Sequence, residues 1–424
     1  MRAEPAGAAA AEEAFQREVR RHLLRNYLAH LVHGLLGQTG FRLIQAPTFV
    51  PAYVHLLSGS DVAVGAARAF QALGQFLSPL LGATAIEHRH RVLPAGLWVG
   101  ALMRVQLLGL ALAGFFLSGA PALVAVFAFL GLFGFFMGMQ GVIFSFLIAK
   151  VIPVERRGRL LGLRNALAGL SAGGVGWLGG ILVERGALGN GYAATFLVAF
   201  ALTSGGLATL LFMREPETPA VRQPAGVGER LRDLPGLLRR DPAFTRYFLA
   251  RSLATMGRMA LPFAVIYADT KLSLSGRALG GLTLAFLVSQ SVGNLGWGWM
   301  ADRRGFRLVF LASLSLSALA MGLLLAAASL AALAAVMVGL GAGQGGFMMS
   351  SQNLVLEFGS RENLPLRIAV ANSASELVGV VAPLAGGLLA AGVSYPAVFW
   401  TAIAFQLAAV LWVARAVAEP RTRP

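Results

Sequence analysis

The chain has 424 residues, of which 57% are hydrophobic and only 13% are charged. Soluble domains are about 45–50% apolar and about 25% charged, so this composition excludes an ordinary soluble protein; the lack of cysteine also excludes disulfides, iron–sulfur clusters and thiol catalysis. The formal net charge of +16 would indicate a nucleic-acid partner for a soluble protein, but we expect none here, because the basic residues concentrate in loops between apolar segments.

Residues 1–27 are charged and lack the apolar core of a signal peptide, so we expect them to form a cytoplasmic tail. Apolar segments follow, each close to the ~20 residues that a helix needs to cross a bilayer. With both termini in the cytoplasm, most of the 35 Lys and Arg residues fall on that side, as the positive-inside rule requires. Twelve spans are expected, at residues 28–54, 62–83, 92–117, 121–149, 159–183, 192–213, 245–268, 278–301, 307–328, 330–356, 366–391 and 393–415.

The long loop 214–244 divides the chain near its middle, and its prolines and arginines predict a connector that lies along the membrane surface. Short patterns recur in the same order on its two sides, such as Gly138-Met-Gln140-Gly and Ala342-Gly-Gln344-Gly. This repetition predicts a duplicated architecture of six plus six helices. We therefore expect an N-terminal bundle at 28–213, a C-terminal bundle at 245–415 and a short cytoplasmic tail at 416–424.

Arg42 and Arg258 lie at matching places in spans 1 and 7, and each precedes a proline and then a tyrosine. A guanidinium in hydrocarbon costs roughly 2.5–3.5 kcal/mol on insertion scales. Glu376 is the only carboxylate well inside a span, so the intramembrane arginines outnumber their possible counter-charges. We expect Arg42 and Arg258 to bind an anion; the alternative is that each pairs with a carbonyl or an acid and only holds helices together. Arg104 also lies deep in a span, and the sequence assigns it no role.

A charged motif between spans 8 and 9 reads Gly298-Trp-Met-Ala-Asp302-Arg303-Arg-Gly305-Phe-Arg307. It resembles the G-x-x-x-D-R-x-G-x-R signature of the major facilitator superfamily (MFS), a family of membrane transporters. With the expected spans, the resemblance covers nearly the whole chain. It implies an all-α membrane protein with twelve transmembrane helices in two six-helix, pseudo-symmetric bundles.

In that family the motif forms a conformational latch at the cytoplasmic face. The resemblance implies that Asp302 pairs with Arg303 and Arg307, while Gly298 and Gly305 allow a tight turn and a close helix approach. The alternative is a solvated cluster of charges. The copy in the first half departs from the motif, because Ile86 stands in the place of the aspartate and Glu87 follows it. Glu87 is therefore the candidate latch residue of that half.

The family fold also implies that spans 1, 4, 7 and 10 line a central cavity near the middle of the membrane. Arginine donates paired hydrogen bonds to carboxylate or phosphate oxygens, and glutamine adds neutral donors and acceptors. The substrate-binding candidates on these spans are Arg42, Gln45, Gln140, Arg258 and Gln344.

Glu376 lies on span 11, which faces span 2 and its Arg68 in the family fold. One hypothesis makes Glu376, with Arg68 beside it, the group that takes up a coupling proton. The other makes it a fixed ion pair or a hydrogen-bonded contact between the helices. The sequence leaves both open.

Together these features predict a secondary active transporter that moves a small anionic solute by alternating access, coupled to an ion or to exchange. Uptake and export stay open. The main rival is a proton-coupled exporter of drugs, which would need acids in the cavity and a glycine–proline motif in span 5; that span has no proline. A sensor on the same scaffold would need an appended soluble domain.

An intramembrane enzyme would need a catalytic cluster at one membrane face, and we expect no enzyme because the sequence shows no such cluster. We expect no cofactor, and no metal because the six histidines lack acids or cysteines nearby. The expected partners are the lipid bilayer, the solute and a coupling ion. We expect a monomer in the inner or plasma membrane.

Overall fold

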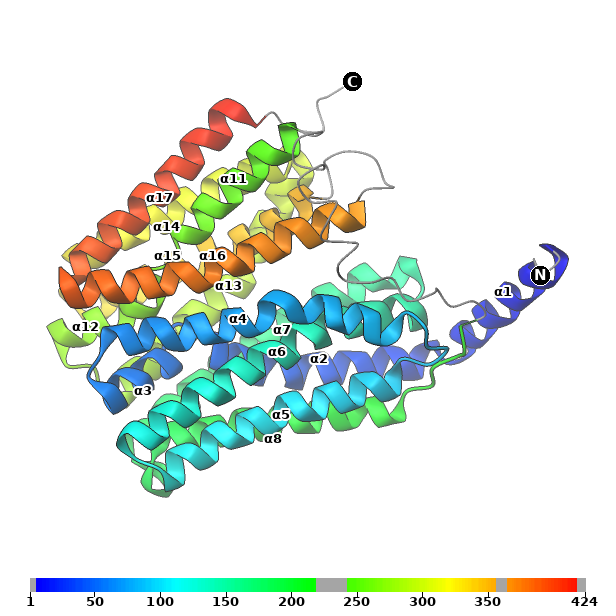
Figure 1. Cartoon of the computed structure of the whole chain (residues 1–424), viewed down its shortest axis with the longest axis horizontal. Helices are drawn as coiled ribbons and strands as arrows, with labels where there is room; N and C mark the ends of the chain where they lie inside the picture. The colour runs from blue at the N-terminus through cyan, green and yellow to red at the C-terminus, as the bar shows by residue number, and fades with distance from the viewer. Residues whose placement is uncertain (1–4, 219–241, 356–363, 418–424) are drawn as a thin grey trace.

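The computed structural model describes residues 5–218, 242–355 and 364–417, and within these ranges the chain is helical without any strand (Figure 1). The connector expected at 214–244 lies mostly outside the described residues, and so does most of the tail expected at 416–424.

The N-terminal helices are α1 (Pro5–Arg21), α2 (Leu23–Gln45), α3 (Phe49–Ser58), α4 (Asp61–Ile86), α5 (Leu93–Phe116), α6 (Gly119–Val151), α7 (Val154–Glu184) and α8 (Gly191–Thr209), with the 3-10 turns η1 (Ala187–Gly189) and η2 (Leu210–Phe212).

The C-terminal helices begin after the connector. They are α11 (Pro242–Met256), η3 (Leu261–Phe263), α12 (Ala264–Leu272), α13 (Gly276–Arg304), α14 (Phe306–Ala326), α15 (Leu330–Leu354), α16 (Leu364–Gly392) and α17 (Tyr395–Ala416). Serine side chains cap several helix starts: Ser60, Ser275 and Ser394 each accept a hydrogen bond from the backbone N–H three residues later. Such caps satisfy N–H groups that have no partner inside the helix.

Ten helices in the described part of the chain are long and apolar enough to cross a membrane. The helices of the first and seventh expected spans are not among them, and each of these two spans is broken. α2 ends at Gln45, just before Pro47, and α3 begins at Phe49. The seventh span breaks between α11 and α12 around Pro262. Proline lacks an N–H and clashes with the preceding turn, so the spans expected at 28–54 and 245–268 each consist of two helical pieces.

Close helix packing depends on glycine at the contacts between the N-terminal and C-terminal helices. α4 packs against α6 on one side and α16 on the other, and α13 packs against α7 and α15 (Figure 1). A Cβ atom at Gly65 of α4 would overlap the carbonyl oxygen of Pro383 on α16, and one at Gly180 of α7 would lie 2.6 Å from the Cα of Gly280 on α13. Only glycine permits backbones to approach this closely.

The two ends of the helix bundle differ in charge. We call the end with the α4–α5, α6–α7 and α13–α14 turns the basic end, since arginines crowd these turns, and the other end the opposite end. At the opposite end, polar contacts join the N-terminal to the C-terminal helices: Thr283 with Thr48 (2.9 Å), Tyr395 with Asp61 (2.8 Å) and Arg277 with Glu184 (3.1 Å). These contacts join the two halves of the chain at the opposite end.

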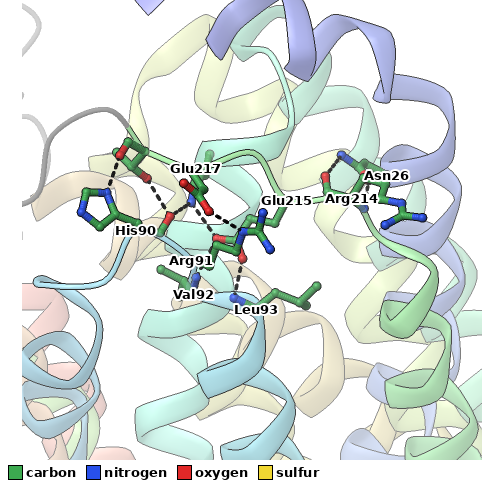
Figure 2. Close-up of polar contacts among 10 residues, drawn as sticks. Asn26, His90, Arg91, Val92, Leu93, Arg214, Glu215 and Glu217 are labelled. Atoms are coloured by element: carbon green, nitrogen blue, oxygen red, sulfur yellow. Dashed lines mark hydrogen bonds and ion pairs between the residues drawn. The ribbon is translucent and has the colours of Figure 1, made fainter. Parts of the chain in front are cut away.

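A buried ion pair fastens the basic end of the N-terminal helices. Glu215, which follows η2, accepts hydrogen bonds from the N–H groups of Val92 and Leu93 at the start of α5, both at 2.7 Å (Figure 2). Its carboxylate also lies 2.7 Å from Nζ of Lys150 near the end of α6, and both side chains are only 3% exposed. Lys150 donates a second hydrogen bond, to the carbonyl of His90. One carboxylate thus ties together α5, α6 and the segment after α8.

Candidate functional site

A cavity of about 390 Å³ lies among α2, α5, α6 and α7, toward the basic end. Phe41, Met103, Met137 and Phe144 supply apolar walls. Its charged lining residues are Arg157 and Arg164, and no carboxylate is found among the described residues that line it. The cavity is therefore apolar over much of its surface and positively charged at one side.

Two of the expected substrate-binding residues, Gln45 and Gln140, line this cavity. Gln45 ends α2, and its Nε2 lies 2.9 Å from Sδ of Met137. Gln140 is 4% exposed, and its Nε2 has no hydrogen-bond partner among the described residues. A Cβ at Gly100 of α5 would lie 2.8 Å from that nitrogen, so glycine makes room for the Gln140 amide.

Arg42 lies outside the cavity lining, at the contact between the N-terminal and C-terminal helices. Its Nη1 donates a 2.7 Å hydrogen bond to Oγ of Ser291 on α13. A Cβ at Gly169 of α7 would overlap Ser291 Oγ and would lie 2.8 Å from the same Nη1. The electrostatic neighbour of Arg42 is Arg164, which places a second guanidinium within reach of its charge.

Arg258 lies in the break between α11 and η3. Its guanidinium carbon is 5.4 Å from the ring centre of Phe347 on α15, a cation–π arrangement. Gln344, the other candidate on α15, is half-buried one turn before Phe347. No contact between described residues joins Arg42 to Arg258, so their binding of one shared anion stays a prediction.

Glu376 is half-buried on α16, and it interacts electrostatically with Arg258 and Arg251. Arg68 interacts electrostatically with Arg258 as well. The hydrogen bonds of Arg68 go elsewhere: its Nη2 donates to the carbonyl of Ala46 at 2.7 Å, and its Nη1 donates to Oε1 of Gln71 at 3.0 Å. Arg68 thus satisfies a carbonyl that the break after α2 leaves free, which is a structural task.

Two residues that sequence reasoning did not select also line the cavity, His33 and Arg164. The His33 ring stacks on Phe144, with centroids 4.7 Å apart, and neither ring nitrogen has a hydrogen-bond partner among the described residues. Arg164 crosses directly over Gly34 of α2, where a Cβ atom would overlap its Cδ. The sequence feature that could have indicated them is the pair of glycines that follows His33, Gly34 and Gly37, because glycines leave space on that face of α2.

The structure also supplies the role that Arg104 lacked. Its Nε donates to the carbonyl of Thr203 on α8 and its Nη1 to the carbonyl of Gly100, both at 2.7 Å. Its guanidinium carbon lies 5.3 Å from the ring centre of Phe41, and the residue is 1% exposed. Arg104 therefore joins α5, α8 and α2 behind the cavity.

The latch candidates are spread over the basic end. Asp302 is exposed, and the pairs expected with Arg303 and Arg307 are not among the contacts of the described residues. Arg303 instead stacks over Trp299, with its guanidinium carbon 4.3 Å from the ring centre, and Nη2 of Arg307 donates to the carbonyl of Ala414 at 2.9 Å. In this conformation both arginines are engaged away from Asp302.

The other latch candidates have backbone roles. Gly305 has φ +82° at the start of α14, a conformation that glycine adopts without strain. A Cβ at Gly298 would meet no atom within 4 Å, so no close helix approach at that glycine is seen within the described ranges. Glu87 follows α4, and its N–H donates to the carbonyl of Ala83 at 3.1 Å. Over the same ranges, no cluster of His, Asp and Glu has the geometry to hold a metal ion.

Comparison with known proteins relates part of the chain to one family and its fold to solved transporters. Residues 247–424 match the model of the family described as Major Facilitator Superfamily. No curated protein sequence matches the chain. The likeness to three solved structures is one of fold, since sequence identity is low in every case.

The first of these is the nucleoside transporter NupG, with a TM-score of 0.70 and 13% identity over 92% of this chain and 98% of that one. The second is a D-xylose-proton symporter, with a TM-score of 0.74 and 13% identity over 95% and 99%. The third is the xylose transporter XylE from E. coli in a partially occluded, inward-open conformation, with a TM-score of 0.72 and 12% identity over 95% and 100%.

Proposed function

We propose that the chain is a member of the major facilitator superfamily, a transporter rather than an enzyme, and that it moves a small anionic solute across the membrane by secondary active transport; the match of residues 247–424 to the family model and the likeness of fold to solved transporters support this. The proposal rests on the residues that line the cavity among α2, α5, α6 and α7. Its lining offers guanidinium groups and glutamine amides and contains no carboxylate within the described chain. A low-dielectric pocket lined by charge of one sign concentrates ligands of the opposite sign.

Alternating access is supported by the unequal ends of the bundle. Polar contacts and glycine approaches close the opposite end, while the cavity lies toward the basic end, where the arginines of the latch motif are engaged away from Asp302. In our proposal the protein is a monomer whose two bundles, at 28–213 and 245–415, rock against each other. The basic end faces the cytoplasm with both chain termini, in an inner or plasma membrane, as the positive-inside rule favours.

Coupling is assigned to Glu376. Its carboxylate interacts with the charge of Arg258, itself close to Arg68, so its protonation would change the charge balance between α4, α11 and α16. This supports a proton as the coupling ion. One structural neighbour is a D-xylose-proton symporter, so proton coupling is compatible with this fold.

The proton-coupled drug exporter is less well supported. A cationic drug would need a carboxylate at the cavity, and the described lining residues provide guanidinium groups instead. The positive charge that attracts anions to this pocket also repels cations from it.

Transport into liposomes tests the proposal. Purified protein would be reconstituted and offered labelled phosphate, glycerol 3-phosphate, lactate and benzoate, with xylose and tetraphenylphosphonium as the neutral and cationic controls. We expect saturable flux of at least one anion and none of the cation. Saturable flux of tetraphenylphosphonium or xylose alone would overturn the anionic assignment.

A further inference from the structure

Several buried polar groups around the cavity lack hydrogen-bond partners within the described chain. His30, His33 and Gln140 are 0%, 7% and 4% exposed, and the buried nitrogens of their side chains are unpaired. Nη2 of Arg104 and Nε of Arg164 are unpaired as well. Buried polar groups in folded proteins are nearly always hydrogen-bonded, so a cluster of exceptions around one cavity indicates a ligand.

We propose that this cavity is the solute site and that it binds an aromatic monocarboxylate, with the carboxylate at Arg164 and the ring between the side chains of Phe41 and Phe144. The inference rests on the proposed function and names the chemical class of its solute. It also adds Arg164 and His33 to the residues that determine specificity.

Of the two arginines that line the cavity, Arg164 is the one whose guanidinium has no hydrogen-bond partner or counter-ion among the described residues. Arg157, the other one, donates Nε to the carbonyl of Ile152 and so caps the end of α6. Arg164 makes no hydrogen bond or ion pair with any residue in the described ranges. Nε2 of the Gln140 amide is a further unpaired donor on the cavity wall. An arginine fork and an amide N–H are the donors that a carboxylate accepts best.

The rest of the wall suits a flat apolar body better than a polyhydroxylated one. Phe41 and Phe144 face the cavity together with Met103 and Met137, and thioethers make favourable contacts with aromatic rings. Two polar side chains of the wall are already occupied: Ser145 donates to the carbonyl of Gly141, and Gln45 donates to a methionine sulfur. Sugar hydroxyls would meet mostly carbon and sulfur here, and would lose their hydrogen bonds to water without replacement.

Glycine positions the arginine. The Arg164 side chain occupies the space in which a side chain at Gly34 would begin. At Gly37, one turn on, a Cβ atom would lie 3.9 Å from Nε2 of His33 and 4.0 Å from Nη2 of Arg104, so these two unpaired groups face the same point. A methyl group at Gly34 would displace Arg164 from the cavity without removing its charge.

Binding to the purified full-length protein tests the proposal, with benzoate, cyclohexanecarboxylate, benzamide and inorganic phosphate as probes in calorimetry. We expect benzoate to bind at least about tenfold more tightly than benzamide or phosphate, because a charge-assisted hydrogen bond and the ring contacts act together. Phe144→Leu should reduce the preference for benzoate over cyclohexanecarboxylate. Arg164→Gln should weaken benzoate at least about tenfold.

Gly34→Ala should reproduce the effect of Arg164→Gln. Gly162→Ala is the matched control, since it lies on α7 near Arg164 and its methyl group would meet no atom within 4 Å. The melting temperature of each ligand-free variant shows that it is folded. The inference is overturned if benzoate does not bind, or if folded Arg164→Gln and Gly34→Ala both keep wild-type affinity. Saturable flux of phosphate or lactate with no benzoate binding would overturn the inference and leave the proposed function standing.

Discussion

Arginines buried among these helices have different tasks, and the partner of each guanidinium decides which. Arg104 and Arg68 donate to backbone carbonyls, at Thr203 and Ala46 respectively, and so stabilise the helices around them. Arg42 donates to Ser291 across the contact between the two halves of the chain. Arg164 has no such partner in the described chain. A guanidinium in hydrocarbon is costly unless it is paired, so the unpaired group is the one to which an anion binds best.

Arg42 and Arg258 provide a first test at this scale. If these two arginines also contact the solute, Arg42→Gln and Arg258→Gln should each lower saturable anion flux at least about tenfold, because a hydrogen bond to a charged group contributes about 1.5–3 kcal/mol. Flux into liposomes is the measurement, and Arg185→Gln is the control, since Arg185 is exposed in the turn after α7. If both variants keep wild-type flux, these two arginines are structural.

Glu376 provides a second test. If it takes up the coupling proton, Glu376→Gln should abolish the dependence of flux on an imposed pH gradient, while solute exchange at equal pH continues. The groups that face its carboxylate, Arg251 and Arg258, stay in place in this variant. Flux that remains driven by the pH gradient in Glu376→Gln would assign Glu376 to a fixed contact between helices instead.

At the scale of helices and turns, the basic end of the N-terminal half depends on one buried carboxylate. Glu215 holds the start of α5 through two backbone N–H groups (Figure 2). It holds the end of α6 through Lys150. Lys150 also donates a hydrogen bond to the carbonyl of His90, in the turn between α4 and α5 that contains Glu87. Where the first copy of the latch motif lacks its aspartate, Glu215 supplies a buried negative charge.

Glu215→Gln should therefore lower the free energy of unfolding by about 3–5 kcal/mol, since it leaves Lys150 buried without its counter-charge. The melting temperature of the purified protein is the measurement. Glu217→Gln is a matched control two residues away, because Glu217 is 65% exposed and pairs with exposed Arg91; such surface pairs contribute about 0–1 kcal/mol. Equal melting temperatures for the two variants would contradict a structural role for the buried pair.

At the scale of the whole molecule, an ion pair and a hydrogen bond join the two halves at the opposite end. Arg277 pairs with Glu184 there, and Tyr395 donates to Asp61. α4 lies beside α16, and α7 packs on α13 (Figure 1). In a transport cycle these contacts must separate before the cavity can reach the other side of the membrane.

Because the chain contains no cysteine, a cross-link can test this requirement without background. Glu184→Cys combined with Arg277→Cys places two thiols on the adjoining ends of α7 and α13, where the side chains now form an ion pair at 3.1 Å. Oxidation or a short bismaleimide linker should stop anion flux, and a reductant should restore it after oxidation. The two single-cysteine variants are the controls. Flux that continues in fully cross-linked protein, quantified by mass spectrometry, would show that this end need not open.

Much of the fold could be read from the sequence. The helical membrane architecture was predicted from hydropathy, and the likeness of fold to a solved transporter agrees with it. The superfamily indicated by the motif around Asp302 is the one whose model matches residues 247–424. Pro47 and Pro262, which the sequence places inside the first and seventh spans, lie at the breaks of those spans. A proline raises the cost of a continuous helix, but neighbouring groups such as Arg68 decide whether the freed carbonyls find partners.

The sequence by itself determined that the chain is a bundle of membrane helices, because hydropathy and intrahelical hydrogen bonding depend on residues close together in the chain. It could also place buried arginines in the membrane. Only the tertiary structure decided which of them is already satisfied, because the partners come from distant helices: Thr203 for Arg104, and Ser291 for Arg42. The cavity at Arg164 exists only where α2, α5, α6 and α7 come together, so no local pattern could reveal it.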